Sequence, residues 1–218
     1  MATGDLFVMT GASGVGKGTL RARLMERVKL YYSISMTTRE PREGERHGVD
    51  YWFVDEATFE NIKKEGGFLE YARYVEHSYG TPRAPVERAL ARGEDVLLEI
   101  EVQGALQVAE KIPEAQLIFI IPPSLSELRR RLLLRGKDSI EKIEKRLERA
   151  REEISMADHF HYVIVNDVLE SAVADLERII LTRRRIVNRM RPALERALKR
   201  DPDLEIELDE IAARINRR

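Results

Sequence analysis

The sequence predicts an α/β fold in which a parallel sheet lies between two layers of helices. Short apolar runs of strand length alternate with segments whose apolar residues recur at helical spacing, which is typical of parallel sheets. Two stretches interrupt this alternation. Residues 33–83 carry aromatic and Thr residues with Gly and Pro turns, and residues 124–157 are helical and rich in Arg. We therefore expect a three-layer core with two insertions, a small mixed or antiparallel β lobe and a helical lid.

The core elements can be assigned in chain order. The run "DLFVMT" at residues 5–10 predicts a buried strand, and a helix follows from Lys17 because apolar residues recur at Leu20, Leu24 and Val28. Near-continuous apolar runs predict further buried strands at residues 95–102, 115–121 and 162–166. Helices are expected between them, at about residues 85–92 and 104–112.

These changes of pattern also set the expected boundaries. The predicted core comprises residues 4–32, 84–123 and 158–183. The β lobe covers 33–83 with a short helix near 56–65, and the lid covers 124–157 with a break near Gly136. Residues 184–218 form a C-terminal extension with two helical segments, the second at 204–218. Three alternatives stay open for the extension: packing on the core, self-association and partial disorder.

Composition limits the classes of function. Apolar residues make up 43% of the 218 residues, enough for a core, and the formal net charge of −1 favours neither nucleic acid nor a membrane as partner. The absence of cysteine excludes disulfides, thiolate chemistry and Cys-ligated zinc. Neither a signal-like start nor an apolar run of membrane length is found, so we expect a cytoplasmic protein, monomer or homodimer. The excess of Arg over Lys fits either ion-pair networks at high temperature or a GC-rich genome.

A glycine-rich loop joins the first strand to the first helix. It reads "GASGVGKGT" and fits Gly-x-x-x-x-Gly-Lys, the P-loop pattern, in the strand-to-helix context that this motif requires. Glycines let successive backbone N–H groups turn inward around phosphates, and the helix N-terminus adds positive charge. The alternative is a plain Gly-rich turn. The candidate triphosphate-binding residues are Gly11, Ala12, Ser13, Gly14, Val15, Gly16, Lys17, Gly18 and Thr19.

The β lobe offers groups that suit a second, phosphate-bearing ligand. Arg39 and Arg42 lie three residues apart and Tyr51 follows a Gly-containing turn, so two guanidinium groups and a phenol could bind a dianionic phosphate. Glu70, Tyr79 and Thr81 follow along the lobe. Each of these residues alone is more simply a solvated charge or an aromatic on a sheet face.

Two acidic residues lie in the predicted strand at 95–102. Glu99 and Glu101 are two residues apart and are expected to face the same side of that strand. Carboxylates among apolar neighbours are costly without a purpose, which makes them candidate binding groups. The alternative is the exposed face of an edge strand.

From about residue 6 to about residue 181, the chain resembles the guanylate kinase family. The stretches that carry the resemblance are "GASGVGKGT", "SISMTTREPREGERHGVDYWFV", "FLEYA", "SYGTP", "LLEIEVQGA", "PPSLSELRRRLLLRG" and "IVND". The resemblance implies that Arg39, Arg42, Tyr51 and Tyr79 hold the GMP phosphate. It also implies that Ser35, Glu70, Thr81 and Glu101 read the guanine, with Glu99 beside them. The family usually has Asp where this chain has Glu99 and Glu101, so the contacts there stay open.

The resemblance also assigns the lid. It implies that Arg135 and Arg146 close over the ATP phosphates, with Arg131 nearby, and that Asn166 lies near the adenine. The implied reaction transfers the terminal phosphoryl group of ATP to GMP or dGMP, giving ADP and GDP, in purine nucleotide metabolism. Lys17, Arg39, Arg135 and Arg146 are the expected catalytic residues. Mg²⁺ would be held mainly through phosphates and water, with Thr19 or Glu99 behind them, because Gly18 replaces the usual Ser or Thr.

Two rival interpretations remain. Guanylate-kinase-like modules in scaffold proteins bind partners with little activity, usually with a degraded P-loop. A phosphotransferase acting on AMP, UMP or a small metabolite is the other rival. The chemistry of Glu70 favours GMP, because a carboxylate can accept both the ring N–H and the amine of guanine, whereas adenine presents an acceptor there.

Overall fold

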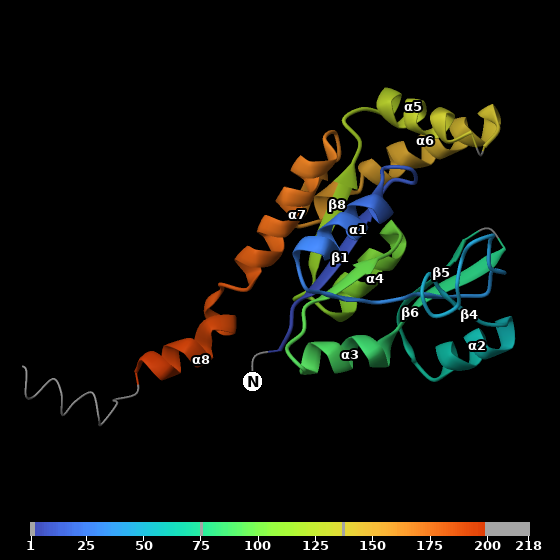
Figure 1. Cartoon of the computed structure of the whole chain (residues 1–218). Coiled ribbons are helices and arrows are strands. Elements are labelled where there is room, and N and C mark those ends of the chain that lie inside the picture. Colours follow the sequence, from blue (N-terminus) through green and yellow to red (C-terminus); the bar gives the residue numbers. More distant parts are fainter. Residues whose placement is uncertain (1–2, 75, 137, 199–218) are drawn as a thin grey trace, which may run out of the picture.

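The core of the molecule is a five-stranded parallel sheet in the strand order β2-β7-β1-β8-β9. The structure is a computed structural model and describes residues 3–74, 76–136 and 138–198 (Figure 1). The sheet strands are β1 (Leu6–Gly11), β2 (Tyr31–Tyr32), β7 (Val96–Glu99), β8 (Gln116–Ile121) and β9 (Tyr162–Val165). The predicted parallel α/β fold is therefore confirmed, and β2 is a short edge strand that the sequence did not reveal.

Helices cover both faces of this sheet because both faces of its strands are apolar. In β1, Phe7 and Met9 pack on the side of α1 (Lys17–Arg27) and α7 (Leu169–Arg183). Leu6 and Val8 alternate with them and pack on the side of α3 (Arg83–Ala91) and α4 (Val102–Lys111). Burying one such side chain stabilises the fold by about 1.5–3 kcal/mol. Because many of them are buried here, the packed three-layer core holds the end of each strand in place.

The inserted β lobe forms a second sheet in the order β4-β3-β6-β5. Its strands are β3 (Met36–Thr37), β4 (Trp52–Phe53), β5 (Phe68–Tyr74) and β6 (His77–Pro82). The sheet is mixed, because β3 pairs antiparallel with β6 but parallel with β4. The lobe's helix α2 (Glu56–Lys64) is capped by Asp55, and Phe59 of α2 stacks on Phe68 of β5 with ring centroids 4.5 Å apart.

The lid segment consists of α5 (Leu125–Arg135) and α6 (Ile140–Ile154), followed by a short 3-10 helix, Ala157–His159. Ser124 and Ser139 cap the two helices, and α5 ends at Gly136, whose φ of 60° is left-handed. Leu128 and Leu132 pack with Ala12 of the glycine-rich loop. The lid helices therefore rest directly on the loop that precedes α1, at the top of Figure 1.

The last described helix, α8 (Val187–Ala197), extends from the end of the core that is opposite the lid (Figure 1). The C-terminal extension thus contains one helix over Val187–Ala197. The helical segment predicted at 204–218 lies outside the described residues. In the part of the chain that is described, no helix is both long and apolar enough to cross a membrane.

Candidate functional site

The glycine-rich loop presents the N-terminus of α1 without a side-chain cap. Gly16 is the N-cap residue, with a left-handed φ of 98° that favours glycine, and it makes no capping side-chain hydrogen bond. A Cβ at Gly16 would also lie only 2.8 Å from Asn166 Nδ2. The first N–H groups of α1 are therefore left for a ligand, and a helix N-terminus of this kind binds anions.

Lys17 and its neighbours complete the loop. The Lys17 ammonium group donates to the carbonyl oxygens of Gly11 at 2.5 Å and Ala12 at 3.4 Å. Asn166 Nδ2 donates to the Val15 carbonyl at 2.8 Å, and Arg131 Nη1 donates to the Asn166 carbonyl at 2.8 Å. The structure thus places Asn166 against the backbone of the loop, and Arg131 holds Asn166 through its carbonyl.

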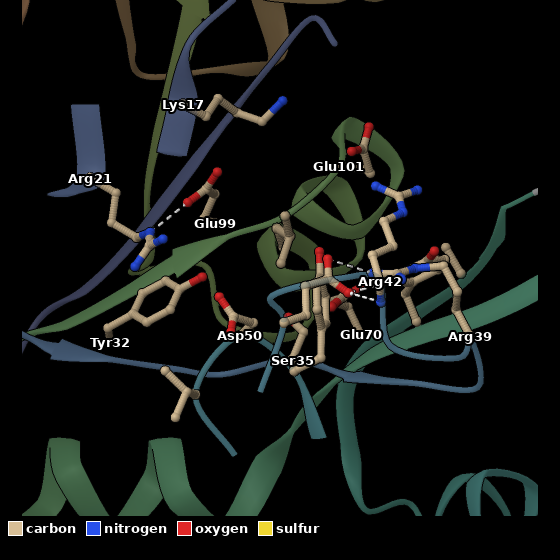
Figure 2. Close-up of a pocket in the computed structure, with 16 residues that line it drawn as sticks. Lys17, Arg21, Tyr32, Ser35, Arg39, Arg42, Asp50, Glu70, Glu99 and Glu101 are labelled. Atoms are coloured by element: carbon tan, nitrogen blue, oxygen red, sulfur yellow. Dashed lines mark hydrogen bonds and ion pairs between the residues drawn. The ribbon is translucent and has the colours of Figure 1, made fainter. Parts of the chain in front are cut away.

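A cavity of about 330 Å³ lies between the loop and the β lobe (Figure 2). This volume is within the range of small-molecule sites. Figure 2 shows Lys17 and Glu99 toward one side of the cavity and Arg39 and Arg42 toward the other. The sequence-predicted residues that line it are Lys17, Ser35, Arg39, Arg42, Tyr51, Glu70, Tyr79, Glu99 and Glu101. Residues far apart in the chain therefore meet in one site.

Arg39 is held at the edge of the cavity by Glu45. Its two terminal nitrogens contact the two carboxylate oxygens of Glu45 at 2.9 and 3.0 Å, and this hydrogen bonding lowers the pKa of Glu45. The guanidinium carbon of Arg39 lies 5.5 Å from the ring centroid of Tyr51 and 5.8 Å from that of Phe53. Among the described residues, Arg39 Nε is buried and has no hydrogen-bond partner, so a donor remains for an acceptor.

Tyr51 and Tyr79 place two phenol rings beside Arg39. Their ring centroids are 6.0 Å apart in an edge-on arrangement. Burial raises the pKa of Tyr51, so its hydroxyl stays protonated and can donate to an anion. Arg42 is exposed, and its backbone N–H donates to Glu45 at 2.8 Å. This end of the cavity therefore combines guanidinium and phenol donors.

Glu70 is a buried carboxylate that lines the cavity from strand β5. It is 4% exposed and accepts a hydrogen bond of 2.6 Å from the Thr81 hydroxyl. Burial raises the pKa of Glu70 to about 6, against the opposing effect of Thr81. A Cβ at Gly104 would lie 2.4 Å from Glu70 Oε2, so the first turn of α4 can approach only because this residue is glycine. Thr81 lies behind Glu70 and does not line the cavity.

The prediction that Glu99 and Glu101 share a strand is wrong. Strand β7 ends at Glu99, and Glu101 is the N-cap residue of α4, with an extended φ and ψ of −76° and 161°. The chain leaves the sheet here because the helix that covers it starts at Val102. The side chain of Glu99 is 17% exposed and that of Glu101 is 49% exposed, and both line the cavity.

The two lid arginines that were predicted to be catalytic do not line this cavity. Arg135 is exposed at the end of α5. Arg146 pairs with Asp138 at 2.9 Å, within the lid segment itself. The structure therefore brings together the loop and the lobe residues but not Arg135 and Arg146.

Four further polar residues line the cavity that sequence reasoning missed, namely Arg21, Tyr32, Glu45 and Asp50. Arg21 could have been found, because it lies one helical turn after Lys17 and so on the same face of α1. Glu45 follows Arg42 by three residues, but only the folded turn shows that its carboxylate reaches Arg39. Tyr32 and Asp50 carried no signal.

Oxygen donors for a metal are sparse in the described part of the chain. No group of three His, Asp or Glu side chains there is arranged to hold a metal ion. Glu99 is a carboxylate near the first turn of α1, where a Cβ at Gly18 would lie 3.8 Å from its Oε1. Thr19 is exposed in the same turn. These hard oxygens fit a cation such as Mg²⁺ that takes most of its ligands from phosphates and water.

Comparison with known proteins relates the whole core to one family. The family model for guanylate kinase matches residues 3–183. A guanylate kinase of Thermus thermophilus is 69% identical over 211 residues, which cover 97% of this chain and 96% of that protein. The guanylate kinase of Oceanobacillus iheyensis is 51% identical over 200 residues, covering 89% of this chain and 97% of that protein.

Solved structures agree with the sequence relatives. A crystal structure of guanylate kinase from Anaplasma phagocytophilum superposes with a TM-score of 0.75 at 33% identity and covers 92% of this chain and 98% of that chain. Residues 3–183, which the family model matches, include the loop, the β lobe and the lid together with the core. The family model and the sequence relatives agree with the glycine-rich loop seen in the structure, so the chain belongs to the guanylate kinase family.

Proposed function

We propose that this chain transfers the terminal phosphoryl group of ATP to GMP or dGMP, giving ADP and GDP or dGDP. The observation that carries the proposal is the cavity shared by Lys17 of the loop and by the guanidinium and carboxylate groups of the lobe. A triphosphate on the loop and an acceptor in the lobe can then meet in line. Membership of the guanylate kinase family supports the same reaction over a scaffold role or an AMP or UMP substrate.

Guanine recognition falls to the buried carboxylate of Glu70. Its raised pKa of about 6 still leaves it ionised at neutral pH, so it accepts from both the ring N–H and the amine of guanine. Thr81 orients it from behind, and Ser35 and Glu101 line the same cavity. Adenine would place an acceptor against this carboxylate and leave a buried charge without its donor, at a cost above about 1–3 kcal/mol.

The GMP phosphate is bound by Arg39, Arg42, Tyr51 and Tyr79. The buried Nε of Arg39, which has no partner among the described residues, is the donor best placed to gain an acceptor on binding. In the transfer step, a phosphate oxygen of GMP forms a bond to the γ-phosphorus of ATP, and the bond from that phosphorus to the β–γ bridging oxygen breaks. ADP leaves with that oxygen. No protein nucleophile is needed, because positioning and charge stabilisation carry this chemistry.

The triphosphate is held by the residues of the glycine-rich loop, with Lys17 against its terminal phosphates. Asn166 braces the loop, and Arg131 holds Asn166. When bound, Mg²⁺ would neutralise charge on the phosphates, and Glu99 or Thr19 would be the protein oxygens that hold its water ligands. Arg135 and Arg146 act after the lid moves toward the cavity, which also excludes water that would otherwise hydrolyse ATP. We place this reaction in the cytoplasm, where ATP and GMP are available, and in purine nucleotide metabolism.

The test is a substrate comparison with a matched variant. Wild-type protein is expected to phosphorylate GMP and dGMP with ATP and Mg²⁺, and AMP and UMP far more slowly. Lys17→Met should lose at least about a hundredfold in turnover while its circular dichroism stays unchanged. Arg23→Ala, an exposed neighbour on α1, is the control and should keep wild-type turnover. Equal rates with AMP, or an active Lys17→Met, would refute the proposal.

A further inference from the structure

The glycine-rich loop of this chain lacks the hydroxyl that such loops usually place on Mg²⁺. That hydroxyl belongs to the residue after the lysine, which here is Gly18. A Cβ built on Gly18 would stand 3.8 Å from Glu99 Oε1. The place that a Ser or Thr side chain would take at residue 18 is therefore faced by a carboxylate oxygen of Glu99. Glu99 comes from β7 and lies 81 residues further along the chain.

Glu99 is fixed in this place by Arg21. Arg21 Nε donates to Glu99 Oε2 at 2.9 Å, with the two side chains 31% and 17% exposed (Figure 2). Because Oε2 is engaged by Arg21, Oε1 is the oxygen that faces Gly18. A Glu side chain has three rotatable bonds before its carboxylate, so without this contact it would sample several positions.

Arg21 is in turn held by an aromatic ring. Its guanidinium carbon lies 4.2 Å from the ring centroid of Tyr32, which also lines the cavity. Burial, followed by the nearby Glu99 charge, raises the pKa of Tyr32 to about 12, so its ring remains a neutral platform. A planar guanidinium can stack on this ring and donate to Glu99 at the same time, which a lysine cannot do equally well.

We propose that Arg21 is a positioning residue for phosphoryl transfer, which holds Glu99 so that its second carboxylate oxygen replaces the missing P-loop hydroxyl on the metal side of the phosphates. This inference rests on the proposed function and deepens it. The carboxylate next to the phosphates would repel them if it were alone. Arg21 offsets the charge of the Glu99 carboxylate on one side, and a divalent cation would offset it on the other. The carboxylate can then bind the metal directly or accept a hydrogen bond from metal-bound water.

A double-mutant cycle tests the inference. Arg21→Met, which keeps an apolar stem to pack on Tyr32, and Glu99→Gln should each lower turnover about ten- to hundredfold, with a smaller effect on the KM for GMP. If Arg21 acts through Glu99, adding Arg21→Met to Glu99→Gln should cost less than about twofold more. Arg21→Lys restores the charge without the fork and should recover part of the activity. Arg23→Ala should match wild type.

Metal binding supplies a readout besides activity. Mn²⁺ replaces Mg²⁺ as a paramagnetic probe, and its affinity for the complex of enzyme, ADP and GMP is measured by electron paramagnetic resonance. We expect about a tenfold loss for Arg21→Met and for Glu99→Gln, no further loss for the double variant, and none for Arg23→Ala. Calorimetric affinity for GMP without metal should be nearly unchanged in Arg21→Met.

The results that would contradict the positioning role of Arg21 differ from those that would contradict the proposed function. Wild-type Mn²⁺ affinity in Arg21→Met, additive losses in the double variant, or an effect confined to GMP affinity would overturn the positioning role. If wild-type protein failed to phosphorylate GMP at all, the proposed function would fall, whereas the Mn²⁺ titrations would still show whether Arg21 acts through Glu99.

Discussion

The proposed choice of GMP depends on the surroundings of one side chain, Glu70. Its carboxylate is buried in the lobe, with the Thr81 hydroxyl on one oxygen and the first turn of α4 close to the other. Burial favours the protonated form and raises the pKa to about 6, because the charged form loses hydration. The protonated carboxyl cannot accept two hydrogen bonds from guanine, since one of its oxygens then carries a hydrogen.

We therefore predict a pH dependence of GMP recognition. As the pH falls through about 6, the group gains a proton and the KM for GMP should rise, whereas above that range the KM should be flat. Glu70→Gln should raise the KM at neutral pH about ten- to hundredfold. The GMP phosphate itself titrates at about pH 6, so it also contributes to the pH dependence of the KM. The ratio of the wild-type KM to the Glu70→Gln KM between about pH 5 and 8 removes that contribution, and a constant ratio would contradict the prediction.

Helix α8 illustrates how an element beyond the family match is attached to the core. Arg189 Nη1 contacts Asp5 Oδ2 at 3.0 Å and Asp95 Oδ1 at 2.8 Å, and Arg184 Nε contacts Asp95 Oδ2 at 2.6 Å. Asp95 also accepts from the backbone N–H of Asp5 at 3.0 Å. Asp5 and Asp95 directly precede β1 and β7, at the end of the sheet opposite the glycine-rich loop. The network therefore stabilises the core without touching the cavity.

Asp95→Ala should lower the free energy of unfolding by about 1–3 kcal/mol at pH 7, because charged hydrogen bonds to a buried acceptor are lost. Burial alone would raise the pKa of Asp95, but the hydrogen bonds from Asp5, Arg184 and Arg189 outweigh it and lower the pKa. A lowered pKa means that this contribution is present at neutral pH and disappears as the pH falls through the folded-state value. Urea unfolding at neutral pH and in acid measures both.

A neighbouring exposed acid provides the control for this network. Glu94→Ala removes a carboxylate that pairs only with exposed Arg92 in the described structure, so its effect on unfolding should be near zero. The KM for GMP should be unchanged in both variants. If Asp95→Ala were as stable as Glu94→Ala, α8 would not be anchored by this network.

The arrangement of lid, core and lobe makes closure a requirement of the proposed reaction. The residues of the loop and lobe already line one cavity, but Arg146 pairs with Asp138 in the lid and Arg135 is exposed. The lid also packs on the loop through Leu128 and Leu132, so a nucleotide on the loop can alter the lid directly. The proposed reaction therefore includes a lid movement in which phosphate replaces Asp138 as the partner of Arg146.

Arg146→Ala should lower kcat at least about a hundredfold while changing the calorimetric affinity for GMP less than about threefold, because its contribution is made in the closed transition state. Steady-state kinetics and titration calorimetry measure the two quantities. Arg151→Ala, an exposed arginine on the same helix, should behave as wild type. A rise in the KM for ATP alone would instead make Arg146 a ground-state binding residue.

Local sequence patterns were sufficient to predict much of the fold of this protein. The parallel core, the two insertions, the lid break at Gly136 and the strand-to-helix context of Lys17 all follow from residues that are neighbours in sequence. Hydrophobic spacing and glycine-rich turns encode such features because they depend on short-range backbone geometry and on which face is buried. The predicted roles of Arg135 and Arg146 came from resemblance, and they await the experiments above.

Only the tertiary structure decided which side chains share the cavity and where its walls end. Glu101 became the N-cap of α4 because β7 stops at Glu99, a limit set by the strands and helices packed beside it. The pairing of Arg21 with Glu99 and that of Glu45 with Arg39 form only in the folded chain, and no sequence pattern marked Tyr32 as a residue of the site. The docking of Arg189 on Asp5 and Asp95 spans nearly the whole chain. Long-range pairings of this kind form only once the core has closed, because packing, not local sequence, brings their partners within hydrogen-bond distance.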